Sequence, residues 1–313
     1  MSDGKKGASE FQDRVAIVTG AGDKIGLGFA HASYLAERGA KIVLNDFGNG
    51  TLGLAEQGIN PDIAEQAAQR IRDAGGEAIA NNGDIADPSS AQAMVASALD
   101  AWGRIDVLIN NAGFASASFF PDIDADDMNR HVGVTLLGCL NTAKAVWPHM
   151  VERGYGRIIN TGSPACFGNP TASYAATKSG LFGFTRTEAI FGQAHNITAN
   201  LLLPAAISRL TEGLPESPFK SHLREHFGAE RVAPVVAHLV SDQCTVTGEA
   251  FTVGGGQFAR IVYAASPAQE IDLTMESVAQ GMANAMDTSE WTPQGSTAES
   301  LVHLGMPPEL EQM

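Results

Sequence analysis

The sequence predicts an α/β fold, a doubly wound parallel sheet of about seven strands with helices on both faces. Short, almost continuous runs of Val, Ile and Leu recur along the first 265 residues, which is typical of strands buried on both faces. Each run is followed by a longer stretch with the apolar spacing of a helix. Because strands and helices alternate regularly, the strands should pair in parallel through helical crossovers.

The expected elements follow one another in a regular order. The apolar runs predict strands at residues 14–19, 41–46, 77–81, 105–110, 157–161, 198–203 and 250–253. The amphipathic stretches predict helices at residues 26–38, 61–74, 89–102, 124–151 and 173–191, the fourth of which is one helix or two. Pro61 is suited to begin the second helix, because its fixed φ angle and missing N–H fit a first turn.

The alternation of strands and helices ends near Ser266. We therefore expect one domain of residues 1–265 and a C-terminal helical extension of residues 266–313. One helix of the extension would present an apolar face formed by Ile271, Met275, Val278, Met282 and Met286. After Arg260 the chain has eight acidic residues and no Lys or Arg, so the extension accounts for more than half of the formal net charge of -15. We expect its helix to pack on its own or a neighbouring subunit.

Composition and charge exclude several classes of protein. With 35 acidic and 20 basic residues, the chain would be repelled by nucleic acid and by anionic membranes. Its hydrophobic content of 44% is enough for a large core and argues against disorder. Three widely spaced cysteines fit reduced thiols better than a disulfide scaffold. Because there is neither a signal peptide nor an apolar run near the roughly 18 residues of a membrane span, we expect a soluble, cytoplasmic protein.

A glycine-rich turn follows the first expected strand. Gly20, Gly22 and Gly26 lie between that strand and the first helix, where backbone N–H groups can approach the pyrophosphate of a dinucleotide. Asp46 ends the second strand about 20 residues further on, where a carboxylate binds ribose hydroxyls. A carboxylate repels the 2′-phosphate of NADP, so Asp46 favours NAD. Lys24, within the turn, is the counter-evidence, because a base there could neutralise a phosphate.

A second group of residues indicates acid–base chemistry. Tyr174 and Lys178 are four residues apart in an expected helix and therefore share one face. An ammonium beside a phenol favours the phenolate, which makes tyrosine usable as a general acid and base near neutral pH. Ser163 follows the fifth expected strand, from which its hydroxyl could hydrogen-bond a substrate carbonyl or hydroxyl.

These motifs make the chain similar to the short-chain dehydrogenase/reductase superfamily over roughly residues 11–258. The residues that carry the resemblance are Thr19-Gly20, Gly26, Asp84, Asn110-Asn111-Ala112-Gly113, Ser163, Tyr174, Lys178, Asn200, Pro204 and Gly254-Gly255. Within the superfamily the chain most resembles the hydroxyacyl-CoA dehydrogenase domain of peroxisomal multifunctional enzyme type 2 and its bacterial relatives. This closer likeness lies in residues 45–48, the glycine-rich insert up to Asn60, and residues 80–81, 145–150, 155–159 and 167–169.

The resemblance implies a Rossmann-like domain that holds NAD along the carboxyl edge of its sheet. Tyr174 would be the acid and base, Lys178 would bind the nicotinamide ribose, and Ser163 would position the substrate oxygen. The implied cofactor-binding residues are Gly20, Gly22, Lys24, Ile25, Gly26, Asp46, Asp84, Ile85, Asn110, Ala112, Gly113, Tyr174, Lys178, Pro204 and Ile207. Because such proteins are usually dimers or tetramers, we expect a homodimer or homotetramer.

The sequence departs from the family's pattern at several positions. Lys24 stands where the family has a glycine, and Thr135 stands where it has the asparagine of a water-mediated proton relay. Threonine offers one hydroxyl and no amide, so we keep Thr135 among the catalytic residues and expect the relay to be rerouted. Pro204 is followed by alanine instead of the usual glycine. Residues 207–228 lie where the superfamily places its substrate-covering helices, so we expect them to form a lid.

The sequence therefore predicts an NAD-dependent oxidoreductase that interconverts a secondary alcohol and a ketone. The substrate stays open between 3-hydroxyacyl-CoA or hydroxysteroid-like compounds and a small cyclic or polyketide-like ketone. Arg209, Lys220 and Arg224 would supply a basic patch for CoA phosphates if they lie together. A non-catalytic NAD-sensing regulator is an alternative of another class. We expect no metal, because no further ligand pattern accompanies His222 and His226.

Overall fold

The computed structural model describes residues 10–48, 60–116, 118–207, 212, 215–272, 274–287, 289–295 and 297–304. Most of the glycine-rich insert that precedes Asn60, and Arg209 of the expected basic patch, lie outside these residues. The chain divides into two units, Met1–Ala259 and Arg260–Met313. The first unit holds the first seven strands of the central sheet and all the residues from which a catalytic site was expected.

The central sheet has eight strands in the order β3-β2-β1-β4-β5-β6-β7-β8. They are β1 (Val15–Thr19), β2 (Lys41–Asn45), β3 (Glu77–Asn81), β4 (Val107–Asn110), β5 (Gly156–Thr161), β6 (Ile197–Pro204), β7 (Ala250–Gly254) and β8 (Gln257–Ile261). Every pairing from β3 to β7 is parallel, which confirms the predicted architecture. The strand order reverses direction between β1 and β4, and open α/β sheets bind their ligands at such a switch point.

The sheet has eight strands where about seven were expected, and the additional strand is β8. β8 follows β7 after Gly255 and Gly256, whose φ angles of +58° and +79° suit the two-residue turn of a hairpin. Its side chains from Gln257 to Arg260 are exposed. An exposed edge strand shows no run of apolar residues, so the pattern that revealed the other seven strands is absent there.

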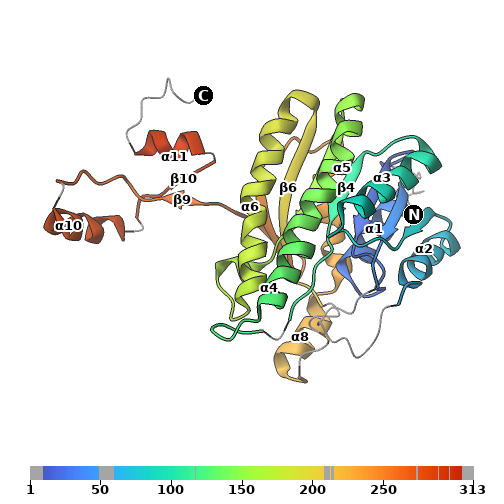
Figure 1. The fold of residues 1–313 in the computed structure, drawn as a ribbon, viewed down its shortest axis with the longest axis horizontal. Coiled ribbons are helices and arrows are strands. Elements are labelled where there is room, and N and C mark those ends of the chain that lie inside the picture. Colours follow the sequence, from blue (N-terminus) through green and yellow to red (C-terminus); the bar gives the residue numbers. More distant parts are fainter. Residues whose placement is uncertain are drawn as a thin grey trace, which may run out of the picture. The chain divides into compact units, whose positions relative to one another are not determined.

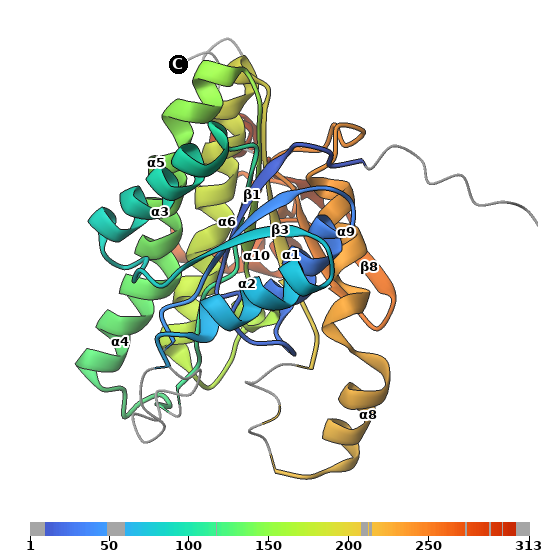
Figure 2. The ribbon, with the colours of Figure 1, turned by 90° about the vertical axis from the view of Figure 1, so that its right-hand side faces the viewer.

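Two layers of helices cover the sheet (Figures 1 and 2). One face packs against α1 (Leu27–Ala36), α2 (Ile63–Asp73) and α9 (Ala233–Leu239). The other packs against α3 (Pro88–Trp102), α5 (Gly138–Arg153) and α6 (Ala172–Gly192). Each layer forms its own apolar core with the fully buried Val, Ile and Leu side chains of the strands. The central strands β1, β4 and β5 are thus buried on both faces, and polar side chains stand at their carboxyl ends.

The segment expected as one helix or two is continuous and contains a π-helical segment. α4 (Ala125–His131) leads into the π segment η2 (Val132–Leu137), which leads into α5. Asp124 caps the start, where its carboxylate accepts a hydrogen bond from the backbone N–H of Asp126. π segments inside α-helices are frequent at functional sites. This one carries Thr135.

Shorter elements connect the main layers or belong to the second unit. Near the sheet lie η3 (Pro164–Phe167), η4 (Gln193–His195), α8 (Pro218–His226) and η5 (Ala229–Arg231). The second unit has two short antiparallel strands, β9 (Ala264–Ala265) and β10 (Thr292–Pro293), and helices α10 (Met275–Ala285) and α11 (Thr297–His303). None of the described helices combines the length and apolar character that a membrane crossing requires.

The helix expected in the extension is α10, and its apolar side chains are exposed. Met275 is 85% exposed, Met282 56% and Met286 73%, and Ile271 and Val278 are also exposed. No residue of α10 is buried. Its packing on another surface therefore stays a prediction.

Candidate active site

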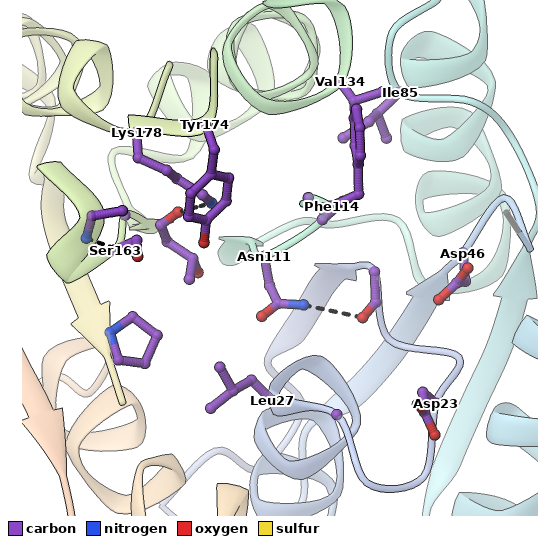
Figure 3. Close-up of a pocket in the computed structure, with 18 of the residues that line it drawn as sticks. Asp23, Leu27, Asp46, Ile85, Asn111, Phe114, Val134, Ser163, Tyr174 and Lys178 are labelled. Carbon is purple, nitrogen blue, oxygen red and sulfur yellow. Dashed lines mark hydrogen bonds between the residues drawn. The ribbon is translucent and has the colours of Figure 1, made fainter. Parts of the chain in front are cut away.

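A cleft of about 1060 Å³ opens at the carboxyl ends of the strands, at the switch point of the sheet (Figure 3). It is lined by the ends of β1, β2, β4, β5 and β6 and by side chains from α4, α6 and α8. Figure 3 shows Asp46 at one end of the cleft and Ser163, Tyr174 and Lys178 at the other. The cleft therefore joins the two groups of residues that the sequence singled out.

The glycine turn packs closely against the strand beside it. A Cβ atom at Gly20, whose φ is +63°, would lie 2.7 Å from Ala112 Cα. A Cβ at Gly28 would lie 2.5 Å from the carbonyl oxygen of Gly20. Asn111 ties the turn to β4, because its Nδ2 donates hydrogen bonds to the carbonyl oxygens of Thr19 and Gly20 at 2.9 and 3.0 Å. Only residues without side chains let the backbone come this close.

Asp46 is held in place by the backbone on both sides. Its Oδ2 accepts a hydrogen bond from the N–H of Gly22, and its Oδ1 accepts one from the N–H of Gly48, each at 2.9 Å. A Cβ at Gly22 would lie 2.9 Å from Oδ2, so the glycine is needed for this contact. Asp23 also lines the cleft, whereas Lys24 is exposed and does not. The charge that faces this end of the cleft is therefore negative.

Tyr174, Ser163 and Lys178 meet at the opposite end of the cleft. Tyr174 and Ser163 direct their hydroxyl groups toward the same space (Figure 3). Ser163 Oγ accepts a hydrogen bond from the N–H of Ala165 at 3.1 Å, which leaves its own proton to donate. Lys178 Nζ donates to the carbonyl oxygen of Thr161 at 2.5 Å and lies 5.8 Å from the centre of the Tyr174 ring. Lys178 is only 4% exposed and no carboxylate pairs with it among the described residues, so its ammonium favours negative charge nearby.

A buried polar network supports this end of the sheet from below. Asn110 Nδ2 donates to Asn160 Oδ1 at 2.9 Å, and Asn160 Nδ2 donates to Glu188 Oε2 at 2.6 Å. Thr142 Oγ1 donates to Asn110 Oδ1 at 2.6 Å. Burial raises the pKa of Glu188 to about 8, although the hydrogen bond from Asn160 opposes the change. The network joins β4, β5, α5 and α6, the elements that carry or precede Gly113, Ser163 and Tyr174.

The sequence-derived site residues fall into two groups. Those that line the cleft are Gly20, Gly26, Asp46, Asp84, Ile85, Ala112, Gly113, Ser163, Tyr174, Lys178 and Pro204. Those that do not line it are Gly22, Lys24, Ile25, Asn110, Thr135 and Ile207. Gly22 acts on the cleft through Asp46, and Asn110 through the network below. Ile207 donates its N–H to the carbonyl oxygen of Phe227 at 2.7 Å and so shapes the approach to α8.

Several lining residues were not selected from the sequence. Asn111 and Phe114 flank the chosen Ala112 and Gly113, so their place in the same motif was an available signal. The other additions include Leu27, Phe47, Asn129, Arg130, Val134, Asn169, Phe219 and Leu223. Phe47 and Asn169 belong to segments that carry the closer resemblance, and Phe219 and Leu223 belong to the expected lid. No motif points to Asn129, Arg130 and Val134, because only the fold brings α4 and η2 to the cleft. His131, discussed below, was also not foreseen, and it lies behind the cleft lining, where its ring stacks on Phe114.

The segment expected to form a lid contributes directly to the cleft. Phe219 and Leu223 of α8 line it. Lys220 Nζ pairs with Glu216 at 2.9 Å and also donates to the carbonyl oxygen of Glu212. Arg224 pairs with both carboxylates, at 2.5 Å to Glu212 and 3.0 Å to Glu216. Two of the three cations proposed for a basic patch are thus already neutralised.

The described part of the chain contains no group of three His, Cys, Asp or Glu side chains that could hold a metal ion. His222 and His226 do lie together, with ring centres 4.5 Å apart. Their nearest ring neighbour is Phe227, 5.9 Å from His222. His222 and His226 therefore lie together on the exposed surface of α8.

Comparison with known proteins defines the class of this protein. A family model described as short chain dehydrogenase matches residues 14–217. The chain therefore belongs to the short-chain dehydrogenase family and is an oxidoreductase. It is 37% identical over 265 residues to the peroxisomal hydratase-dehydrogenase-epimerase of Saccharomyces cerevisiae, covering 84% of this chain and 28% of that protein. It is 34% identical over 250 residues to the 3-oxoacyl-[acyl-carrier-protein] reductase of Synechocystis, covering 78% and 96% of the two chains.

A solved structure extends the comparison to almost the whole chain. The full-length peroxisomal multifunctional enzyme type 2 from Drosophila melanogaster superposes with a TM-score of 0.75 and 28% identity, over 96% of this chain and 50% of that one. The resemblance to this branch of the family is thereby confirmed. The chain spans half or less of the length of these peroxisomal relatives.

Short-chain dehydrogenases generally use NAD or NADP, and the residues of the cleft fit a dinucleotide. Gly20 and Gly26 of the turn line the cleft and have no side chain that would keep a ligand away from the backbone. Asp46 is oriented by two N–H groups, which leaves lone pairs on its oxygens for hydroxyl groups. The bound cofactor supplies the hydride chemistry, and the protein supplies its orientation and the proton chemistry.

Proposed function

We propose that this protein is an NAD-dependent dehydrogenase that interconverts a secondary alcohol and a ketone with Tyr174 as general acid and base. The observation that carries the proposal is the position of Tyr174 and Ser163 in the same cleft as the glycine turn and Asp46. Two hydroxyl groups converge where a substrate oxygen would lie. The same cleft extends to the carboxylate that would bind the far end of the cofactor.

In the direction of oxidation, Ser163 Oγ donates a hydrogen bond to the substrate oxygen and Tyr174 takes the proton of the substrate hydroxyl. Lys178 stabilises the phenolate through its buried ammonium, which has no carboxylate partner among the described residues. The hydrogen bond from Lys178 to Thr161 fixes the ammonium beside the tyrosine ring. In the reverse direction Tyr174 returns the proton to the carbonyl oxygen.

NAD is favoured over NADP by the charges at the cofactor end of the cleft. Asp46 and Asp23 both line it, and Lys24 does not. A 2′-phosphate beside Asp46 would place two anions within a few ångströms of each other, which opposes its binding. The carboxylate of Asp46 instead suits the two hydroxyls of an unphosphorylated ribose.

The proposed substrate is a 3-hydroxyacyl-CoA. Its support is the likeness to relatives whose names include a dehydrogenase joined to a hydratase and a 3-oxoacyl reductase. Phe114, Phe219 and Leu223 give the cleft an apolar lining that suits an acyl chain. Against CoA stands the pairing of Lys220 and Arg224 with carboxylates, so a small cyclic or polyketide-like ketone is the second candidate.

The test is a substrate panel assayed by NADH absorbance. The panel holds 3-hydroxybutyryl-CoA, a longer 3-hydroxyacyl-CoA, a hydroxysteroid and a cyclic alcohol, each with NAD and with NADP. We expect oxidation of the acyl-CoA with NAD to have the highest kcat/KM. A preference for the cyclic alcohol would replace the substrate assignment, and binding of NAD without turnover of any alcohol would favour the regulator.

We also propose that the protein is a cytoplasmic homodimer or homotetramer. The support for oligomers is the pair Ile190 and Phe191 near the end of α6, which are 60% and 67% exposed. Large apolar side chains gathered on a helix surface are typical of subunit interfaces. The support for a reducing compartment is that Cys139, Cys166 and Cys244 are all free thiols. Light scattering after size exclusion measures the oligomeric state.

A further inference from the structure

A row of buried polar side chains runs along one side of α4 and η2. Asp127, His131 and Thr135 stand at every fourth position, which places them on the same helix face. They are 9%, 0% and 0% exposed. Oδ2 of Asp127, Nδ1 of His131 and Oγ1 of Thr135 are buried without a hydrogen-bond partner in the described part of the chain. Because each such atom costs about 1–3 kcal/mol, stability does not explain the row.

The inner end of the row borders the catalytic lysine. A Cβ atom at Gly113 would lie 3.4 Å from Lys178 Nζ and 3.8 Å from Thr135 Oγ1. The ammonium and the hydroxyl thus both border the position that a side chain at residue 113 would occupy, and the glycine leaves that position open. Polar groups in this arrangement are commonly bridged by an ordered water.

The middle of the row contacts the catalytic tyrosine. The His131 ring stacks on Phe114, with centres 4.1 Å apart, and meets the edge of the Tyr174 ring at 6.0 Å. Its Nε2 lies 3.2 Å from Ser116 Oγ and 3.9 Å from Asp127 Oδ1. One ring nitrogen therefore faces the outer end of the row, and the other is the unpartnered Nδ1.

Burial is the main reason why the ring of His131 is neutral near pH 7. Burial lowers the pKa of His131, and the cations Arg130 and Lys178 lower it further, whereas Asp127 raises it. Asp127 and Arg130 belong to α4, the helix that also carries His131. Lys178 belongs to α6, which faces the ring of His131 through Tyr174. A neutral imidazole has one donor and one acceptor nitrogen, so it can take a proton on one side and release one on the other.

We propose that His131 and Asp127 form the outer part of the path by which the proton of Tyr174 exchanges with solvent, where an asparagine relay is missing. The inference rests on the proposed function. In oxidation the substrate hydroxyl gives its proton to Tyr174, and one proton passes by way of Lys178 and a water to Thr135 Oγ1. A second water carries it from Thr135 Oγ1 to Nδ1 of His131, since neither of these atoms has a partner among the described residues. His131 releases a proton from its other nitrogen toward Ser116 and Asp127, and so to solvent. One proton leaves for each hydride that NAD accepts, and reduction reverses the path.

A second buried histidine provides a matched control. His31 on α1 is 1% exposed, and neither of its ring nitrogens has a hydrogen-bond partner in the described residues. Burial lowers the pKa of His31 to about 3, with no charged group contributing. His31 therefore shares the burial of His131 but not its place beside Tyr174. Replacing each by glutamine separates the loss of a buried imidazole from the loss of a relay.

The kinetic test compares His131→Gln with His31→Gln, using NAD and the best alcohol of the panel. We expect kcat of His131→Gln at pH 7 to fall by about tenfold or more, with KM unchanged and with a larger solvent isotope effect in D2O. The first turnover should keep its rate, since hydride transfer itself is intact. In His131→Ala, added imidazole should restore part of kcat. Unchanged kcat in His131→Gln, or an equal loss in His31→Gln, would overturn the proposal.

A titration that needs no substrate separates this inference from the proposed function. The imidazole of His131 is followed by NMR in the wild type and in two variants. We expect its pKa to rise in Lys178→Met, because a cation is removed, and to fall in Asp127→Asn, because an anion is removed. If neither pKa changes, the row is not coupled to Lys178 and the path is wrong, even if the dehydrogenase activity is found. If the changes occur but no alcohol is oxidised, the proposed function fails instead.

Discussion

Replacing Glu188 by glutamine should abolish a loss of stability that the wild type suffers as the pH rises. Burial raises the pKa of Glu188 from 4.5 to about 8 in the folded protein. Between these two values the folded chain binds one proton more than the unfolded chain, so the free energy of unfolding falls as the pH increases. The slope is about 1.4 kcal/mol per pH unit. From pH 5 to pH 7 the wild type should therefore lose about 2 to 3 kcal/mol through this one group.

Urea unfolding followed by circular dichroism at pH 5 and pH 7 measures this difference. Other titrating groups affect wild type and variant alike, so the comparison isolates residue 188. Glu152→Gln, at an exposed position of α5, is the control and should keep the pH dependence of the wild type. If Glu188→Gln loses as much stability between pH 5 and pH 7 as the wild type does, then Glu188 is not a neutral carboxyl group in the folded protein.

Three further predictions concern the cofactor end, the glycine turn and the extension. Asp46→Ala should weaken NAD binding by about tenfold or more, since hydrogen bonds to a carboxylate are lost. The same variant should bind NADP more tightly. Fluorescence titrations that detect neither change would contradict the assignment of Asp46 to the ribose. Gly28→Ala should cost about 1–3 kcal/mol, because its Cβ would lie 2.5 Å from a backbone oxygen. Gly183→Ala should instead raise the melting temperature, because a Cβ at this helix position has no neighbour within 4 Å. Equal changes in stability for the two glycine variants would refute the packing argument. Deleting residues 266–313 should change the oligomeric state, stability or KM, because α10 exposes an apolar face; a deletion that alters none of them would show that the extension packs on nothing.

The parts of the fold that local patterns encode were predictable from the sequence. The buried strands were recognisable as apolar runs in the sequence, because the parallel sheet is covered by helices on both faces. Tyr174 and Lys178 were found because a helix repeat of 3.6 residues brings positions four apart together. The glycine turn and Asp46 could be selected from the sequence because a dinucleotide site requires both a close backbone approach and a carboxylate at a fixed strand end; the fold places both at the same cleft.

The parts that depend on contacts between distant segments were not predictable. Glu188 looks like any charged residue of an amphipathic helix, and only the packing of α6 on β5 buries it against Asn160. In the sequence, Lys220 and Arg224 suggested a phosphate-binding patch. In the folded chain these two cations form ion pairs with Glu216 and Glu212. His131 carries no motif of its own. The proposed role of His131 in proton transfer depends on its contacts with Phe114 and Tyr174, which belong to two other segments of the chain.

The most direct test of the central claim is the activity of Tyr174→Phe. Phenylalanine keeps the ring that packs against His131 and removes only the hydroxyl group. NADH formation is measured with the best alcohol of the panel, and NAD binding is measured in parallel by fluorescence. We expect the rate to fall by about 100-fold or more while NAD affinity is unchanged, because proton transfer is lost and the cofactor contacts are not. Oxidation at the wild-type rate by Tyr174→Phe would contradict the assignment of this cleft as the catalytic site.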